Sequence, residues 1–92
     1  MARRFRNCIG PRVRRLRIDR GWTQDNLAAK LQLAGLDGFD RVVVAKIESQ
    51  LRSAFDYEAA VIARVLGVTL DDLLPGKSVL DKDLEDLVAG ER

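Results

Sequence analysis

Residues 9–31 read IGPRVRRLRIDRGWTQDNLAAKL, and this stretch contains the signals for two helices joined by a short connection. Apolar side chains recur at helical spacing in its first half, at Ile9, Val13 and Leu16. Pro11 is tolerated in a first helical turn because its missing N–H would have no partner there, and Gly21 ends the pattern. Thr23 is a suitable N-cap for a second helix. The inward stripe of that helix would consist of Leu27, Ala28 and Leu31. The stretch therefore predicts two consecutive helices.

The rest of the chain continues the helical pattern, and no stretch alternates apolar and polar residues as a half-buried strand does. Asp40 can cap a short third helix. Its buried stripe would consist of Val44, Ile47 and Leu51. Asp56 can cap a fourth helix, which Gly67 ends, and Thr69 opens a T-x-x-D box for a brief fifth helix through Leu74. A sixth helix would follow, with one apolar face formed by Leu80, Leu84, Leu87 and Val88. The predicted fold class is all-α.

Charge is distributed unevenly along the 92 residues, a length that suits a single domain. Residues 1–20 contain eight Arg and one Asp and carry a net charge of +7, whereas residues 71–92 carry −4. The planar donor fork of Arg suits phosphate. The amino-terminal end therefore favours a polyanion, and the carboxyl-terminal end repels one.

Composition excludes several classes of function. Cys8 is the only cysteine and there is no histidine, which excludes a disulfide framework, a zinc site of several thiolates or imidazoles, and a His-based catalytic triad. The chain has no glycine-rich phosphate loop, so we expect neither an enzyme nor a cofactor. No apolar run approaches the roughly 18–20 residues of a membrane span. We therefore expect a soluble, cytoplasmic protein with no membrane partner.

Four motifs occur in order along the chain. They are I-x3-V-x2-L-R at 9–17, G-W-T-Q-x2-L-A at 21–28, K-I-E at 46–48 and L-G-V-T-L-D-D-L-L at 66–74. This series resembles the XRE family, the Cro and phage-repressor type of helix-turn-helix regulator. The resemblance implies a lambda-repressor-like fold of five helices with an additional C-terminal helix. It divides the chain into a basic N-terminal arm (1–8), a helix-turn-helix DNA-binding domain (9–76) and an acidic C-terminal helix (77–92).

The same resemblance implies roles for individual residues on double-stranded DNA. Arg41, Val42 and Lys46 would touch base edges, with Arg41 bonding guanine bidentately and Val42 meeting a thymine methyl group. Contacts to the DNA backbone would come from Thr23, Gln24, Val43, Ser49, Arg52 and Ser53. Arg17 and Glu48 match a pair that bridges the first helix to the end of the recognition helix.

The sequence departs from the family pattern before the recognition helix. Seven residues lie between Leu31 and Phe39, more than the usual turn of roughly three or four has room for. The second helix could run on through Leu33, or the loop could bulge toward DNA or solvent. Asp37 and Asp40 would lie near the expected phosphates and oppose binding.

Some positions have a structural interpretation beside the functional one. Arg3, Arg4 and Arg6 could form an arm in a minor groove or simply a solvated basic terminus. We expect Trp22 to be a buried wedge between the first two helices. Phe55 and Tyr57 flank the fourth helix's cap and are expected to act as a staple or as core residues.

The leading functional hypothesis is a sequence-specific transcriptional regulator, a repressor that binds a palindromic operator as a homodimer. The two recognition helices would then lie about 34 Å apart along the duplex. We expect the dimer contact in the acidic last helix together with Leu70, Leu73 and Leu74. The alternative is a protein-binding module or antitoxin-like partner protein, in which the long turn and the valines form an apolar patch.

Overall fold

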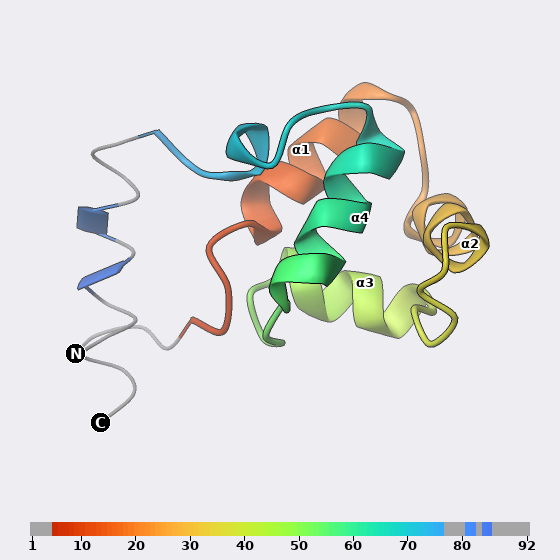
Figure 1. Ribbon diagram of the computed structural model, residues 1–92, viewed down its shortest axis with the longest axis horizontal. Helices are drawn as coiled ribbons and strands as arrows, with labels where there is room; N and C mark the ends of the chain where they lie inside the picture. The colour runs from red at the N-terminus through yellow and green to blue at the C-terminus, as the bar shows by residue number, and fades with distance from the viewer. Residues whose placement is uncertain (1–4, 77–80, 83, 86–92) are drawn as a thin grey trace.

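The computed structural model describes residues 5–76 together with residues 81, 82, 84 and 85. This part of the chain forms four α-helices, one short 3-10 helix and no strand. The elements are α1 (Gly10–Asp19), α2 (Gln24–Leu33), α3 (Arg41–Glu48), α4 (Asp56–Leu66) and η1 (Asp71–Leu73). Figure 1 shows α1, α3 and α4 gathered together, with α2 at one end of the group. The predicted all-α class is confirmed for the described residues.

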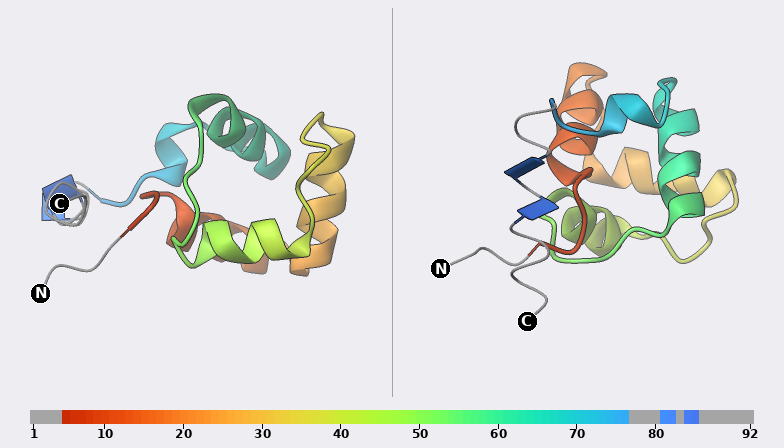
Figure 2. Two further views of the ribbon diagram at one scale, coloured as in Figure 1. Left: turned by 90° about the horizontal axis from the view of Figure 1, so that it is seen from below. Right: turned by 60° about the vertical axis from the view of Figure 1, so that its left-hand side comes forward.

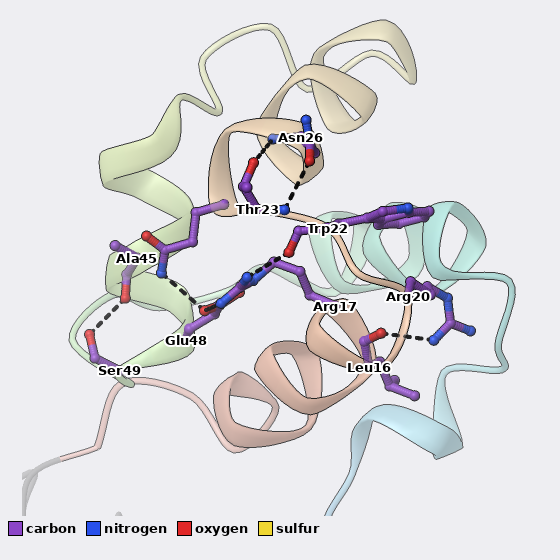
Figure 3. A network of polar contacts seen from close by, with 10 residues as sticks. Leu16, Arg17, Arg20, Trp22, Thr23, Asn26, Ala45, Glu48 and Ser49 are labelled. Atoms are coloured by element: carbon purple, nitrogen blue, oxygen red, sulfur yellow. Dashed lines mark hydrogen bonds and ion pairs between the residues drawn. The ribbon is translucent and has the colours of Figure 1, made fainter.

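The connection between α1 and α2 consists of residues 20–23, and its turn chemistry is local. Gly21 adopts φ 71°, which costs a glycine little. Oγ1 of Thr23 accepts a hydrogen bond from the Asn26 N–H at 3.0 Å, and Asn26 Oδ1 accepts one from the Thr23 N–H at 2.9 Å (Figure 3). This reciprocal cap starts α2 where the sequence predicts it.

The connection between α2 and α3 is long, as predicted, but it is packed against the domain. It spans residues 34–40, because α2 runs to Leu33. Leu36 and Phe39 are buried in the core, and the side-chain amide of Gln32 donates to the Phe39 carbonyl at 2.7 Å. The extra residues therefore form a turn that is held in place by its own buried side chains and by a hydrogen bond to α2.

The caps of α3 and α4 differ. Asp40 caps α3 as predicted, since its side chain accepts a hydrogen bond from the backbone N–H three residues later at 2.9 Å. Asp56 was expected to cap α4 but is its first helical residue. The Glu58 carboxylate instead reaches back and accepts from the Phe55 N–H at 2.9 Å. Gly67 ends α4 in the left-handed conformation, with φ 73°, as predicted.

The predicted fifth helix is not an α-helix, so the described residues contain four α-helices rather than five. The T-x-x-D box does form: the Thr69 N–H donates to Asp72 at 2.9 Å, and the Asp72 N–H donates to the Thr69 hydroxyl at 3.3 Å. Pro75 disfavours a helical conformation at Leu74, which is extended, and only the 3-10 turn η1 remains. Figure 2 shows η1 beside α1 and α4.

The predicted C-terminal helix (77–92) lies mostly outside the described residues. Four of its residues are described and are helical: Asp81, Lys82, Leu84 and Glu85. Among the helices of the described chain, none is both long enough and apolar enough to cross a membrane.

One core holds the described helices together. Its largest fully buried side chains are Val13, Leu27, Leu31, Val44, Ile47, Ile62, Leu66 and Leu73. Leu73 is 0% exposed, so the expectation that it joins a two-fold contact is wrong, whereas Leu70 is exposed. Leu51 is 68% exposed, contrary to the predicted stripe of α3, because α3 ends at Glu48 and the left-handed Gln50 (φ 64°) redirects the chain.

The aromatic residues also depart from expectation. Phe55 and Tyr57 are exposed and stack on each other, with ring centroids 5.8 Å apart, so neither is a core residue. Trp22 is half-buried against the core, and the Lys30 ammonium lies 4.6 Å from its ring centroid. Trp22 thus fills the α1–α2 corner only in part.

Candidate functional site

The outer face of α3 carries the side chains predicted to read bases. All three are exposed: Arg41, Val42 and Lys46. On the opposite face Val44 and Ile47 are buried, and Val43, predicted beside the DNA backbone, is half-buried. α3 therefore turns one side to the core and presents the other to solvent, along one edge of the domain (Figures 1 and 2).

A buried ion pair joins α1 to the end of α3. Arg17 Nε lies 2.7 Å from Glu48 Oε2, and Nη2 lies 3.0 Å from Oε1. The two side chains are 10% and 3% exposed. Arg17 Nη1 also donates to the Trp22 carbonyl at 2.8 Å (Figure 3). A planar guanidinium held by a carboxylate and a carbonyl has a fixed orientation, and it fixes α3 relative to α1 in turn.

Gln24, the predicted phosphate anchor, belongs to the same network. Its side-chain amide donates to Glu48 Oε1 at 3.1 Å, and the residue is half-buried. A carboxamide nitrogen has two N–H groups, so one can serve this bond while the other serves a ligand. The neighbouring Thr23 is exposed, and its hydroxyl accepts the capping bond of α2. The N-terminus of α2 is thereby tied to the end of α3.

Arg41 has an acidic neighbour that sequence reasoning missed. Its Nε lies 4.0 Å from a carboxylate oxygen of Asp25, with side chains 58% and 76% exposed. Both residues belong to the first turn of their helices, which only the packing of α2 against α3 brings together. Lys46 takes part in no ion pair within the described residues. The two predicted base-reading cations therefore differ in their surroundings.

The turn after α3 contains three predicted backbone contacts, and the structure gives each a local partner. Arg52 Nη1 and Nη2 donate to Glu58 Oε1 and Oε2 at 3.1 and 3.2 Å. The Arg52 guanidinium also lies 4.9 Å from the Phe39 ring centroid. The Ser49 hydroxyl donates to the Ala45 carbonyl at 2.8 Å (Figure 3). Ser53 is exposed, and its carbonyl accepts a hydrogen bond from Arg52. Arg52 is thus the most constrained of the three.

The described part of the predicted N-terminal arm packs on the domain. Phe5 is buried, and the Arg6 N–H donates to the Gln50 carbonyl at 3.0 Å while the Arg6 side chain is exposed. Arg3 and Arg4 lie outside the described residues. Residues 5–8 are therefore continuous with the domain.

Asn7 is a residue that sequence reasoning missed. Its Oδ1 accepts from the N–H groups of Ile9 and Gly10 at 3.0 and 2.8 Å, and its amide donates to the carbonyls of Ile47 and Arg52 at 3.1 and 2.7 Å. One buried side chain thus binds the N–H groups at the start of α1 and carbonyls at and after the end of α3. The preference of asparagine for helix N-termini could have revealed the first role, but nothing in the sequence reveals the second.

The described residues offer little for other ligands. They contain no group of three or more His, Cys, Asp or Glu side chains that could hold a metal ion. Every deeply buried side-chain nitrogen or oxygen atom in the described part of the chain has a hydrogen-bond partner. The deeply buried polar side chains of the described residues are therefore satisfied within the protein.

Comparisons with known proteins give a likeness in structure. No protein-family model matches the chain, and no curated protein matches it. The crystal structure of the DNA-binding domain of BldD matches with a TM-score of 0.64 and 25% identity, over 77% of this chain and 94% of that one. A hypothetical transcription factor, NHTF from Neisseria, matches with a TM-score of 0.65 and 26% identity, over 85% of this chain and 84% of that one. These neighbours support a helix-turn-helix fold of the transcription-factor type.

Proposed function

We propose that the chain is a sequence-specific DNA-binding transcriptional regulator of the XRE type, with α3 as its recognition helix. Arg41, Val42 and Lys46 would read base edges in the major groove. The N-terminus of α2, with Thr23 and Gln24, would contact a backbone phosphate. The likeness to transcription-factor structures supports the proposal.

The observation that carries the proposal is the way α3 is mounted. Glu48, its last residue, is held by Arg17 of α1 and Gln24 of α2 at 2.7–3.1 Å, while the opposite face of the helix remains exposed. A reading helix must keep its side chains within a fraction of an ångström of a fixed geometry, and buried supporting bonds supply that.

Selection from a random pool of duplex DNA tests the proposal directly. We expect repeated rounds to enrich one sequence, which the protein then binds at least about 10³-fold more tightly than a scrambled duplex at the same salt concentration. Both affinities should fall as salt rises. If the pool shows no enrichment and the chain retains no duplex at low salt, the proposal is wrong.

We further propose that the protein binds as a homodimer to a palindromic operator and represses by occluding polymerase. A domain of this size gains stability from self-association. Leu70 and Leu84 are exposed apolar residues in the regions predicted to make the contact. Enrichment of two inverted half-sites about 10 base pairs apart, with a dimeric mass in solution, is the expected result. A single half-site bound by a monomer would contradict it.

A second candidate function is a protein-binding module. Phe55 and Tyr57 stack on each other and are exposed, which leaves an aromatic pair available to a partner at the start of α4. Apolar residues that gather at a surface often mark protein contacts. The same DNA titration distinguishes the two candidates, because a module of this kind needs no affinity for duplex DNA.

A further inference from the structure

A groove of about 710 Å³ opens at the surface between α1 and the end of α3. Its α1 wall is formed by Pro11, Arg14, Arg15, Ile18 and Asp19, and Glu48 and Gln50 line its other side. The groove therefore begins beside the last residue of the proposed recognition helix. Its position was not evident from the sequence, where Arg12, Arg14 and Arg15 are equivalent members of one basic stretch.

The charges in the groove do not cancel. Glu48 is neutralised by Arg17, and Asp19 lies 3.3 Å from Arg15 in an exposed i,i+4 pair. Arg14 is exposed and takes part in no ion pair within the described residues. Arg14 is thus the cation whose charge the groove leaves available to an anionic ligand.

The packing of the helices fixes Arg14 relative to α3. Gly10 of α1 lies so close to the end of α3 that a Cβ atom there would be 2.3 Å from the Ile47 carbonyl oxygen and 2.8 Å from that of Glu48. Arg14 follows Gly10 by four residues on the same helix, about one turn away. Its backbone position is therefore set by the contact that sets α3.

We infer that this groove receives a backbone phosphate of the DNA strand that borders α3, and that Arg14 is the cation that binds it. The inference rests on the proposed DNA-binding function and adds a contact outside the helix-turn-helix elements α2 and α3. Arg15 contributes less, because a phosphate must compete with Asp19 for its guanidinium. Ile18 gives the groove an apolar wall that suits a deoxyribose better than a second charge.

Arg12 provides a matched control on the same helix. It is exposed, but its Nε donates to the Asp72 carbonyl at 2.9 Å, on the side of α1 that faces η1. Arg12→Ala and Arg14→Ala remove the same charge from the same helix, two residues apart. A general effect of net charge would weaken binding equally in both variants, whereas a phosphate contact in the groove would separate them.

The test measures the affinity of the full chain for its selected duplex between 50 and 200 mM KCl. We expect Arg14→Ala to reduce the slope of log affinity against log salt by about 0.9, and Arg12→Ala to leave it near the wild-type value. The affinity gap between wild type and Arg14→Ala then narrows about three- to fourfold over this range. Arg14→Lys should keep the wild-type slope, and the thermal midpoints of Arg14→Ala and Arg14→Lys should match that of wild type.

Two outcomes would overturn the inference. If Arg14→Ala keeps the wild-type slope, or if both alanine variants reduce it equally, the groove binds no phosphate, while the proposed function stands. If the wild-type chain selects no duplex at all, the proposed function fails first, and the groove contact fails with it.

Discussion

The guanidinium of Arg17 and the carboxylate of Glu48 face each other across the α1–α3 contact, with Nε 2.7 Å from Oε2 and Nη2 3.0 Å from Oε1. Both side chains are almost fully buried, so each charge is solvated mainly by the other. Removal of one partner leaves an uncompensated buried charge, which costs more than the pair itself contributes. The pair therefore specifies the orientation of α3 more than it stabilises the fold.

Arg17→Met should lower the free energy of unfolding by about 3–5 kcal/mol. The double variant Arg17→Met/Glu48→Leu should recover most of that loss, because two apolar side chains need no charge compensation. Urea unfolding followed by circular dichroism measures both. Arg15→Ala, which breaks the exposed pair with Asp19, is the control and should change the free energy by about 1 kcal/mol or less. A single variant as stable as wild type would contradict the argument.

Gly10→Ala should destabilise the protein although alanine is the better helix former. The added Cβ would meet the backbone carbonyls of Ile47 and Glu48 at 2.3 and 2.8 Å, and α1 would have to move away from α3. We expect a loss of about 1–3 kcal/mol from this overpacking, net of the gain in helix propensity. Thermal or urea unfolding provides the measurement.

Gly38→Ala is the matched control for that substitution. Nothing lies within 4 Å of the position of its Cβ, and its φ is not in the left-handed region. It should be neutral or stabilising by up to about 1 kcal/mol, because alanine restricts the unfolded chain. Equal effects of the two substitutions would show that close packing at Gly10 is not the cause.

Local signals explain how much of the fold could be predicted. The cap at Thr23, the cap at Asp40 and the left-handed stop at Gly67 act within a few residues, so a sequence displays them directly. The prediction of a fifth α-helix was wrong because Pro75 stops the helix that the T-x-x-D box at Thr69 starts. The prediction that Leu51 is buried was wrong because the apolar periodicity of the sequence continues past Glu48, the residue at which α3 ends.

The candidate site was less predictable, because its contacts join distant segments. The exposed face of α3 follows from periodicity, but the partners of its residues do not. Asp25 reaches Arg41 only through the packing of α2 on α3, and Arg52 meets Glu58 and Phe39 after α3 and α4 have been placed. The side chain of Asn7 donates to the carbonyl of Ile47, which lies 40 residues later in the sequence. No spacing rule within one helix contains such contacts.

Asp72 should make stability depend on pH in the acid range. The backbone N–H of Thr69 donates a hydrogen bond to the Asp72 carboxyl at 2.9 Å and is the main reason that the pKa of Asp72 lies below the ordinary value of 3.8. The Thr69 side chain and then Arg12 lower the pKa further. A pKa lowered by folding stabilises the native state above the unfolded value, and that contribution is lost as pH falls through the folded value. Wild type should therefore lose stability relative to Asp72→Asn below about pH 4.

Unfolding midpoints of the two proteins between pH 6 and pH 2, at roughly equal ionic strength, test this difference. Asp71→Asn is the control, since Asp71 is an exposed neighbour whose side chain makes no capping hydrogen bond within the described residues. If the unfolding midpoints of wild type and Asp72→Asn differ by the same amount at every pH, the capping bond does not favour the charged carboxylate.

Arg41 should carry discrimination between DNA sequences rather than general affinity. A bidentate guanidinium–guanine contact is worth about 1–3 kcal/mol, so Arg41→Ala should lower the ratio of affinities for selected and scrambled duplexes by about 5- to 150-fold. Asp25→Asn should act differently: it removes a negative charge 4.0 Å from Arg41 and should tighten binding to both duplexes. Arg64→Ala, a change at an exposed residue in the last turn of α4, is the control and should leave the ratio unchanged. Fluorescence anisotropy at one salt concentration measures all three. If Arg41→Ala weakens both duplexes by the same factor, Arg41 binds phosphate and another residue of α3 must read the sequence.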